Sequence, residues 1–216
     1  MGLEYMAASN PSVATFSKPA ESKSNLHPHI RERWSPRSFR DAPVSLEDVK
    51  TLLEAARWAP SSSNEQPWRF IVGRKEDQET FAKVLSVLVE SNQVWAKNAP
   101  VLLLAVAKKT NSKGLENRWA RHDVGLALGS LVFQATALGL HVHMMAGFNP
   151  DKAREIFHIP DDYDVTTAAA VGYLGDPNAL PEKLKARELA ARTRKPIEEI
   201  AFTSDWGHPA FTSDSD

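Results

Sequence analysis

Pro100-Val101-Leu102-Leu103-Leu104-Ala105-Val106-Ala107 is the stretch that decides the fold. It is short and apolar at every position, which is the pattern of a β-strand covered on both faces. We therefore place this strand at the centre of a sheet. Predicted helices and strands alternate on either side of it, with no internal repeat, and this alternation predicts one layered α/β or α+β domain.

Apolar spacing outward from the central strand predicts the remaining elements. Helices are expected at residues 45–58, 77–90, 118–140 and 150–158, and strands at residues 68–73, 141–147 and 165–174. The first helix has the clearest start, because Ser45 can accept amide hydrogen bonds and Glu47 and Asp48 follow it at the positive helix end.

The helix at 118–140 is apolar nearly all round from Val124 onward. Polar residues and glycines interrupt it, so it falls short of the roughly 18 continuous apolar residues of a membrane span, and we expect no membrane partner. A helix that is apolar all round needs cover on more than one side. We expect its second face to meet a partner subunit, with Gly125 and Gly129 permitting close helix approach.

The composition is typical of one globular domain. The 216 residues carry 26 Lys and Arg against 27 Asp and Glu, and this balance disfavours a general nucleic-acid binder. The chain has no cysteine, which excludes disulfides, iron–sulfur clusters and thiolate nucleophiles and fits a reducing cytoplasm.

The N-terminus lacks the pattern of a secretory signal. We expect a flexible N-terminal tail at 1–27, one domain at 28–205 and a loose C-terminal tail at 206–216.

Several familiar catalytic patterns are missing from the chain. It has no G-x-G-x-x-G after a strand, no P-loop, no G-x-S-x-G and no H-E-x-x-H. His141 and His143 would point the same way from a strand, but no third ligand accompanies them. We therefore favour surface or core histidines over metal ligands and expect no metal.

Two polar segments could carry chemistry. In Arg33-Trp34-Ser35-Pro36-Arg37-Ser38-Phe39, Pro36 favours an extended chain, from which Arg33, Ser35 and Arg37 would project to one side. Two guanidinium groups and a hydroxyl suit a phosphate, while an exposed basic strand is an equal alternative from this segment alone. The second segment, residues 59–68, is a proline-bracketed loop with hydrogen-bonding side chains, for which an ordinary capped turn is the stronger interpretation by itself.

Taken in order, these segments resemble the FMN-dependent nitroreductase family over residues 28–202. The resemblance rests on Arg-x-Ser-x-Arg-x-Phe at 33–39, Pro-Ser-Ser-x-Asn-x-Gln-Pro-Trp at 60–68, Ala-Gly-Phe at 146–148, Gly-Tyr-Leu-Gly at 172–175 and Arg-Thr-Arg-Lys-Pro at 192–196. It implies an α+β, nitroreductase-like three-layer sandwich with a mixed sheet flanked by helices. It also implies an intertwined homodimer that binds FMN at each of two sites in the subunit interface.

The resemblance further implies which residues hold the flavin. Those at the phosphate and ribityl chain would be Arg33, Trp34, Ser35 and Arg37 of one subunit, joined by Arg192 and Arg194. The other subunit would contribute Pro60, Ser61, Ser62, Asn64 and Gln66. Met145, Ala146 and Gly147 would run beside the isoalloxazine ring, with the Gly147 N–H donating to the nitrogen that accepts hydride. No side chain is expected to be catalytic, because the flavin carries the chemistry.

The implied activity is oxidation of NADH or NADPH and reduction of nitroaromatic or quinone acceptors, by ping-pong hydride transfer through bound flavin. A flavin-binding protein without efficient turnover, or a flavin-consuming or dehalogenating relative on the same fold, remains an alternative. The chain departs from some relatives, because Ala146 stands where they carry Glu and because the segment after Ala107 is short. Residues 108–119 could therefore form a lid over the substrate, or equally a solvated linker.

Overall fold

A four-stranded sheet is the centre of the computed structural model, which describes residues 16–211. The strands are β1 (Trp68–Arg74), β2 (Val101–Lys108), β3 (His141–Met145) and β4 (Tyr163–Gly172), in the order β1-β2-β4-β3. All three pairings are antiparallel, and Arg74 at the end of β1 lies opposite Val101 at the start of β2. The predicted α+β class is confirmed, but within the described residues the sheet is antiparallel rather than mixed.

The connections explain why the sheet is antiparallel. Between β1 and β2 the chain forms two short helices, α3 (Gln78–Val87) and α4 (Glu90–Ala96), and then enters β2 at the end of the sheet where β1 finished. A parallel pair would instead need a connection that crosses to the opposite end of the sheet. Alternation of helices and strands along the sequence does not distinguish these two routes.

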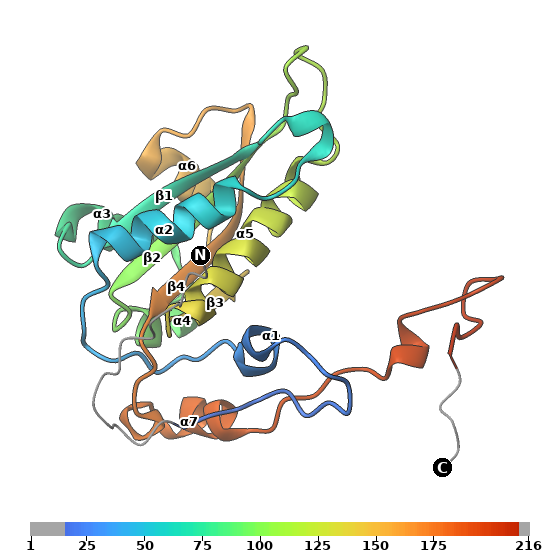
Figure 1. The fold of residues 1–216 in the computed structure, drawn as a ribbon. Helices are drawn as coiled ribbons and strands as arrows, with labels where there is room; N and C mark the ends of the chain where they lie inside the picture. Colours follow the sequence, from blue (N-terminus) through green and yellow to red (C-terminus); the bar gives the residue numbers. More distant parts are fainter. Residues whose placement is uncertain (1–15, 212–216) are drawn as a thin grey trace, which may run out of the picture.

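Helices cover both faces of the sheet, as the three-layer prediction requires (Figure 1). On one face, α2 (Leu46–Arg57) and α5 (Ala120–Ala137) pack with alternate residues of β2, including Leu103 and Ala105. On the other face, α3, α4 and α6 (Pro150–Phe157) pack with Leu102 and Leu104. The first seven residues of β2 are therefore buried, and the prediction of a central strand is confirmed.

The predicted helix at 77–90 ends early, at Val87, and a separate helix begins at Glu90. Leu88 is buried and has extended backbone, and it forms an isolated antiparallel bridge with Phe148. The N–H of Val89 then donates to the carbonyl of Gly147 over 3.0 Å. This tertiary pairing takes the chain out of the helix before α4 begins, and no local pattern in the sequence indicates it.

Two further helices, α1 (Pro28–Glu32) and α7 (Glu182–Leu189), lie together at one end of the sandwich (Figure 1). The segment after α7 leads away from the body of the domain, and Trp206 near its end is 91% exposed. Of the predicted N-terminal tail, residues 1–15 lie outside the described part of the chain, and residues 16–27 run past α1 and α7. Residues 212–216 of the predicted C-terminal tail also lie outside it.

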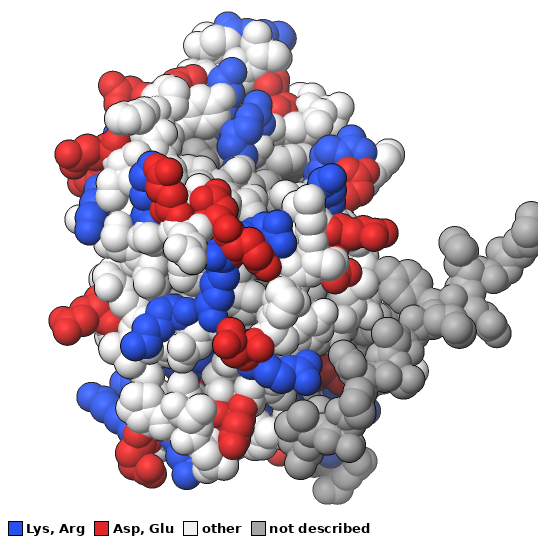
Figure 2. Space-filling view, turned by 90° about the vertical axis from the view of Figure 1, so that its left-hand side faces the viewer, with Lys and Arg blue, Asp and Glu red and all other residues white. Residues whose placement is uncertain are grey.

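Two expectations, that the protein has no membrane span and is no general nucleic-acid binder, can be compared with the described residues. No helix among residues 16–211 is long and apolar enough to cross a bilayer. On the face shown in Figure 2, Lys and Arg are interspersed with Asp and Glu rather than gathered into a region of one sign. An anion would therefore have to be held by a local arrangement of cations, and the chain contains one such arrangement.

Candidate cofactor site

The segment after α1 has the alternation that the sequence predicts. Trp34, Pro36 and Ser38 are buried, whereas Arg33, Ser35 and Arg37 are half-buried. Trp34 anchors the segment, because its ring is 6% exposed and meets the ring of His141 edge-on at 6.1 Å. The extended backbone therefore places both guanidinium groups and the Ser35 hydroxyl on the side away from the core.

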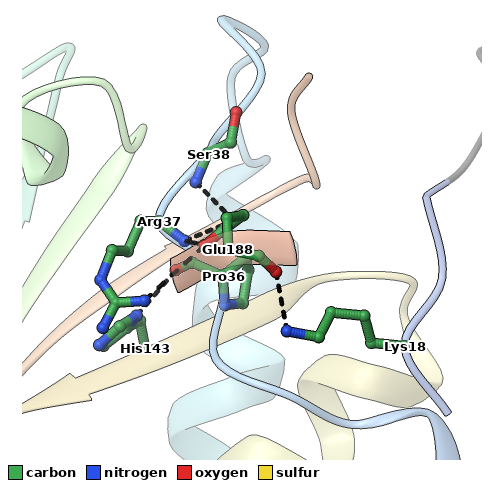
Figure 3. Close-up of polar contacts among 6 residues, drawn as sticks. All are labelled: Lys18, Pro36, Arg37, Ser38, His143 and Glu188. Carbon is green, nitrogen blue, oxygen red and sulfur yellow. Dashed lines mark hydrogen bonds and ion pairs between the residues drawn. The ribbon is translucent and has the colours of Figure 1, made fainter. Parts of the chain in front are cut away.

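A buried carboxylate on α7 holds this segment in place (Figure 3). The side chain of Glu188 is fully buried and accepts hydrogen bonds from the N–H of Arg37 (2.8 Å) and of Ser38 (3.0 Å). The Arg37 guanidinium lies 3.8 Å from the same carboxylate. A buried carboxylate needs this kind of partner set, because desolvation of an unpaired charge is costly. Glu188 thus compensates the charge of Arg37 and fixes its backbone.

Three other arginines form a cationic cluster, defined here as Arg33, Arg192 and Arg194. Burial lowers the pKa of Arg33, and the nearby charge of Arg194 lowers it further. Burial likewise lowers the pKa of Arg192, with added repulsion from Arg33 and then Arg194. No acidic side chain contributes to either pKa change. Partly desolvated cations that repel one another are a suitable site for a dianion such as a phosphate monoester.

An apolar hollow adjoins the cluster. Its volume is about 350 Å³, and it is lined by His29, Ile30, Arg33, Gly129, Val132, Phe133 and Met144. Two of these lining residues, Phe133 and Met144, are each 42% exposed, which is high for large apolar side chains. The hollow therefore presents both a cation and apolar surface, on the side of the molecule where α5 is uncovered.

The residues 61–66 form a strained loop, called here the 61–66 loop. Ser63, Asn64 and Gln66 have φ values of 51°, 56° and 47°, in the left-handed region that residues other than glycine rarely adopt. The N–H of Ser62 donates to the buried carboxylate of Asp123 over 3.1 Å, and the N–H of Gln66 donates to Ser61 Oγ over 3.0 Å. Backbone strain retained by specific contacts is common at ligand sites, so the loop keeps its place as a predicted part of the site.

The 61–66 loop is tied to the segment that the sequence leaves open as lid or linker. Glu65 accepts hydrogen bonds from the N–H and the hydroxyl of Ser112, both at 2.7 Å. An isolated bridge between Thr110 and Glu116 closes this segment into a hairpin-like loop. Because the contact fixes residue 112 to the 61–66 loop, the segment is a structured neighbour of the candidate site, and its action as a lid stays a prediction.

The end of β3 provides the third group of predicted residues. The side chain of Met145 is buried in the core, so only its backbone remains for a ligand, whereas Ala146 is exposed. The carbonyl of Gly147 accepts from the N–H of Val89 and from Asn92 Nδ2, each at 3.0 Å. Among the described residues the Gly147 N–H has no acceptor. A Cβ at Gly147 would lie 2.6 Å from Asn92 Nδ2, so a side chain there would have to displace Asn92.

A single chain does not bring all the predicted residues together. The 61–66 loop is held by Asp123 near the start of α5, whereas the rings of His27 and His29, at the start of α1, lie 5.2 Å from that of Phe133. Ten residues of helix separate these two contacts, which corresponds to about 15 Å along the axis. The 61–66 loop and the cationic cluster thus lie toward opposite ends of α5.

The two histidines of β3 are positioned by packing. His143 Nδ1 lies 2.8 Å from the carbonyl oxygen of Pro36, and its ring contacts Trp95. Burial lowers the pKa of both His141 and His143 to about 4, which keeps the rings neutral at pH 7. Within residues 16–211 no three His, Asp or Glu side chains are grouped as metal ligands.

Sequence reasoning missed the residues that support the site. Glu188, Asp123 and Asn92 each hold a predicted segment through a contact distant in sequence. Asp123 has a usable signal in the sequence, because it is an acid at the edge of an otherwise apolar helix. The structure shows this side chain only 2% exposed. Glu188 and Asn92 lie among ordinary polar helix residues, and no sequence pattern marks them.

Comparison with known proteins gives consistent matches. The nitroreductase family model matches residues 30–173. A solved structure described as an oxidoreductase containing FMN has a TM-score of 0.83 and 38% identity, covering 89% of this chain and 98% of its own. A nitrobenzene nitroreductase of Ectopseudomonas oleovorans is 53% identical over 71 residues, 33% of this chain and 30% of the relative. An NADH dehydrogenase of Thermus thermophilus is 27% identical over 174 residues, 66% of this chain and 83% of the relative.

Proposed function

The chain belongs to the nitroreductase family of oxidoreductases, and from this premise we propose that it is an FMN-dependent NAD(P)H oxidoreductase that reduces nitroaromatic or quinone acceptors. The observation that carries the proposal is the cationic cluster of Arg33, Arg192 and Arg194, in which no guanidinium group forms an ion pair with an acid among the described residues. The similar structure described as containing FMN supports the cofactor. The names of the nitrobenzene nitroreductase and the NADH dehydrogenase support the acceptor and donor classes.

The residues present fit FMN. The cationic cluster suits its phosphate, and the apolar hollow beside Arg33 provides surface next to those charges. The Gly147 N–H, which has no acceptor among the described residues, is available to a ring nitrogen. The carbonyl of Ala146, which shares a peptide plane with this N–H, accepts from the N–H of Phe148 over 3.0 Å, so the N–H has a fixed direction. Bound FMN would supply two-electron chemistry, taking hydride from NADH or NADPH and then reducing an acceptor in ping-pong order.

The roles of the chain's own groups follow from their chemistry. Arg33, Arg192 and Arg194 bind and orient a phosphate, and Glu188 keeps the Arg37 backbone in position for the same purpose. The 61–66 loop presents short polar side chains and backbone at a ligand. No acid or base among these residues is needed for hydride transfer, and the hydroxyl of Ser62 or a water molecule would provide a proton where one is required.

We propose further that the protein is a homodimer whose two sites are each built from both chains. The α5 outer face, defined here as His122, Gly125, Leu126, Gly129 and Phe133, is exposed. Leu126 and Phe133 are 38% and 42% exposed, and a Cβ at either glycine would meet nothing within 4 Å. An apolar helix face flattened by glycine suits packing against a second copy. That packing would bring the 61–66 loop of one chain to the cationic cluster of the other.

An anaerobic visible spectrum tests the proposed activity. We expect the purified protein to show a flavin band that bleaches when NADH or NADPH is added and returns when a quinone follows. A bound flavin that neither nucleotide reduces would contradict the oxidoreductase proposal and favour a flavin-binding protein without turnover. A protein that is colourless and takes up no added FMN would contradict the cofactor assignment itself.

A further inference from the structure

The chain before residue 30, where the match to the family model begins, runs directly past the cationic cluster. Residues 16–24, called here the N-terminal strap, have no helix or strand but are held by specific hydrogen bonds. The N–H of Ala20 donates to the carbonyl of Arg31 over 2.7 Å, and the Arg31 guanidinium donates to the carbonyls of Ala20 (3.1 Å) and Ser24 (2.9 Å). The strap is thus fixed to α1, immediately before the segment that carries Arg33 and Arg37.

Lys18 of the strap places its ammonium group against the backbone of Glu188, on the helix whose carboxylate holds Arg37 (Figure 3). Its Nζ donates to the backbone carbonyl of Glu188 over 2.7 Å and lies 4.8 Å from the centre of the Trp34 ring. Burial lowers the pKa of Lys18, and the charges of Arg192 and Arg37 lower it further, while Glu188 opposes them. An ammonium group has three protons, and only one of them is used by the Glu188 carbonyl.

The strap also sets the direction of Arg192. The Nη1 of Arg192 donates to the carbonyl of Lys18 over 2.8 Å and to that of Arg31 over 3.0 Å. Because the guanidinium group is planar, these two contacts of Nη1 also fix the direction of the Nε and Nη2 groups. Among the described residues, Nε and Nη2 of Arg192 have no hydrogen-bond acceptor. The backbone of residue 18 therefore orients an arginine whose charge also acts on the ammonium group of residue 18.

We propose that the N-terminal strap is part of the anion site, with the Lys18 ammonium binding the phosphate of FMN and the Lys18 carbonyl aiming Arg192 at the same phosphate. The identity of the anion rests on the proposed function, whereas the positions of Lys18 and Arg192 do not. Binding a dianion would relieve the repulsion that the charges of Arg192 and Arg37 exert on the Lys18 ammonium group. The competing role for Lys18 is structural, as a cation beside the last carbonyls of α7.

Titration of the flavin-free protein with FMN and with riboflavin, which lacks the phosphate, separates these roles. Removal of one cation from a phosphate site costs about tenfold in affinity. We therefore expect Lys18→Met to weaken FMN binding about tenfold and to leave riboflavin binding unchanged, and we expect Lys18→Arg to recover most of the loss. Lys23→Met is the matched control, because Lys23 is an exposed cation of the same strap, and it should leave both ligands unaffected.

Three other results would contradict either the role of Lys18 or the proposed function. Unchanged FMN binding by Lys18→Met would refute the role of Lys18 while leaving the proposed function intact. Equal weakening of FMN and riboflavin would show that Lys18 acts only on the structure, which also refutes it. If the unaltered protein binds neither ligand, the proposed function fails and the inference about the strap fails with it.

Discussion

Replacement of Glu188 by Gln should destabilise the protein by about 3 kcal/mol. In the structure both carboxylate oxygens face donors, because Oε1 accepts from the N–H of Arg37 (2.8 Å) and of Ser38 (3.0 Å), and Oε2 accepts from Arg37 at 3.0 Å. The amide keeps one acceptor and turns an NH₂ group toward an N–H. A hydrogen bond to a charged group contributes about 1.5 to 3 kcal/mol, and the 3.8 Å ion pair with Arg37 is lost as well.

Urea unfolding of the flavin-free protein, followed by tryptophan fluorescence at fixed protein concentration, measures this loss. The expected decrease in the free energy of unfolding corresponds to a decrease in midpoint temperature of roughly 6 to 12 °C for a chain of this size. Glu182→Gln is the matched control, because Glu182 lies exposed on the same helix, and its effect should be much smaller. A loss below about 1 kcal/mol for Glu188→Gln would refute the view that this carboxylate holds the segment at 37–38.

Three further predictions concern other parts of the structure. Gly147→Ala should cost about 1 to 2 kcal/mol in urea unfolding, because the new methyl would displace Asn92, and an unchanged midpoint would contradict the close approach. Burial lowers the pKa of His143 to about 4, below its unfolded value, so the unfolded state binds more protons and stability present above about pH 6.5 is lost as pH falls toward 4. His143→Gln should reduce the difference in unfolding free energy between pH 7 and pH 4.5, whereas the exposed His208→Gln should not, and equal differences would refute the assignment. Leu126→Glu on the α5 outer face should give monomers without FMN in sedimentation and absorbance measurements, unlike Lys50→Glu on α2, and a flavin-bound monomer would contradict the composite site.

The sequence predicts the elements whose patterns are local. The continuous apolar run of β2 and the capped start of α2 are both found where expected, and Ser45 accepts from the N–H of Asp48 as a helix cap should. The antiparallel order of the sheet and the break at Leu88 were not predictable in this way. Both depend on pairings between residues far apart in the chain, such as Leu88 with Phe148.

The candidate site shows the same division. Alternating burial along residues 33–38 follows from local sterics, because Pro36 favours an extended chain and side chains in such a chain alternate. The contacts of Lys18 with Glu188 and Arg192 join residues about 170 positions apart, and no spacing in the sequence indicates them. The left-handed residues of the 61–66 loop were also unexpected, since serine and asparagine give no clear signal of strain.

The flavin content of mixed dimers tests the composite site most directly. One chain would carry Arg33→Ala with Arg192→Ala, the other would carry Asn64→Ala with Ser62→Ala, and two different tags would isolate the heterodimer. If each site joins the cationic cluster of one chain to the 61–66 loop of the other, one site receives both defects and the other receives none. The account predicts that each parent homodimer lacks FMN and that the heterodimer binds one FMN per two chains. A heterodimer as empty as its parents would show that both halves of the site come from the same chain.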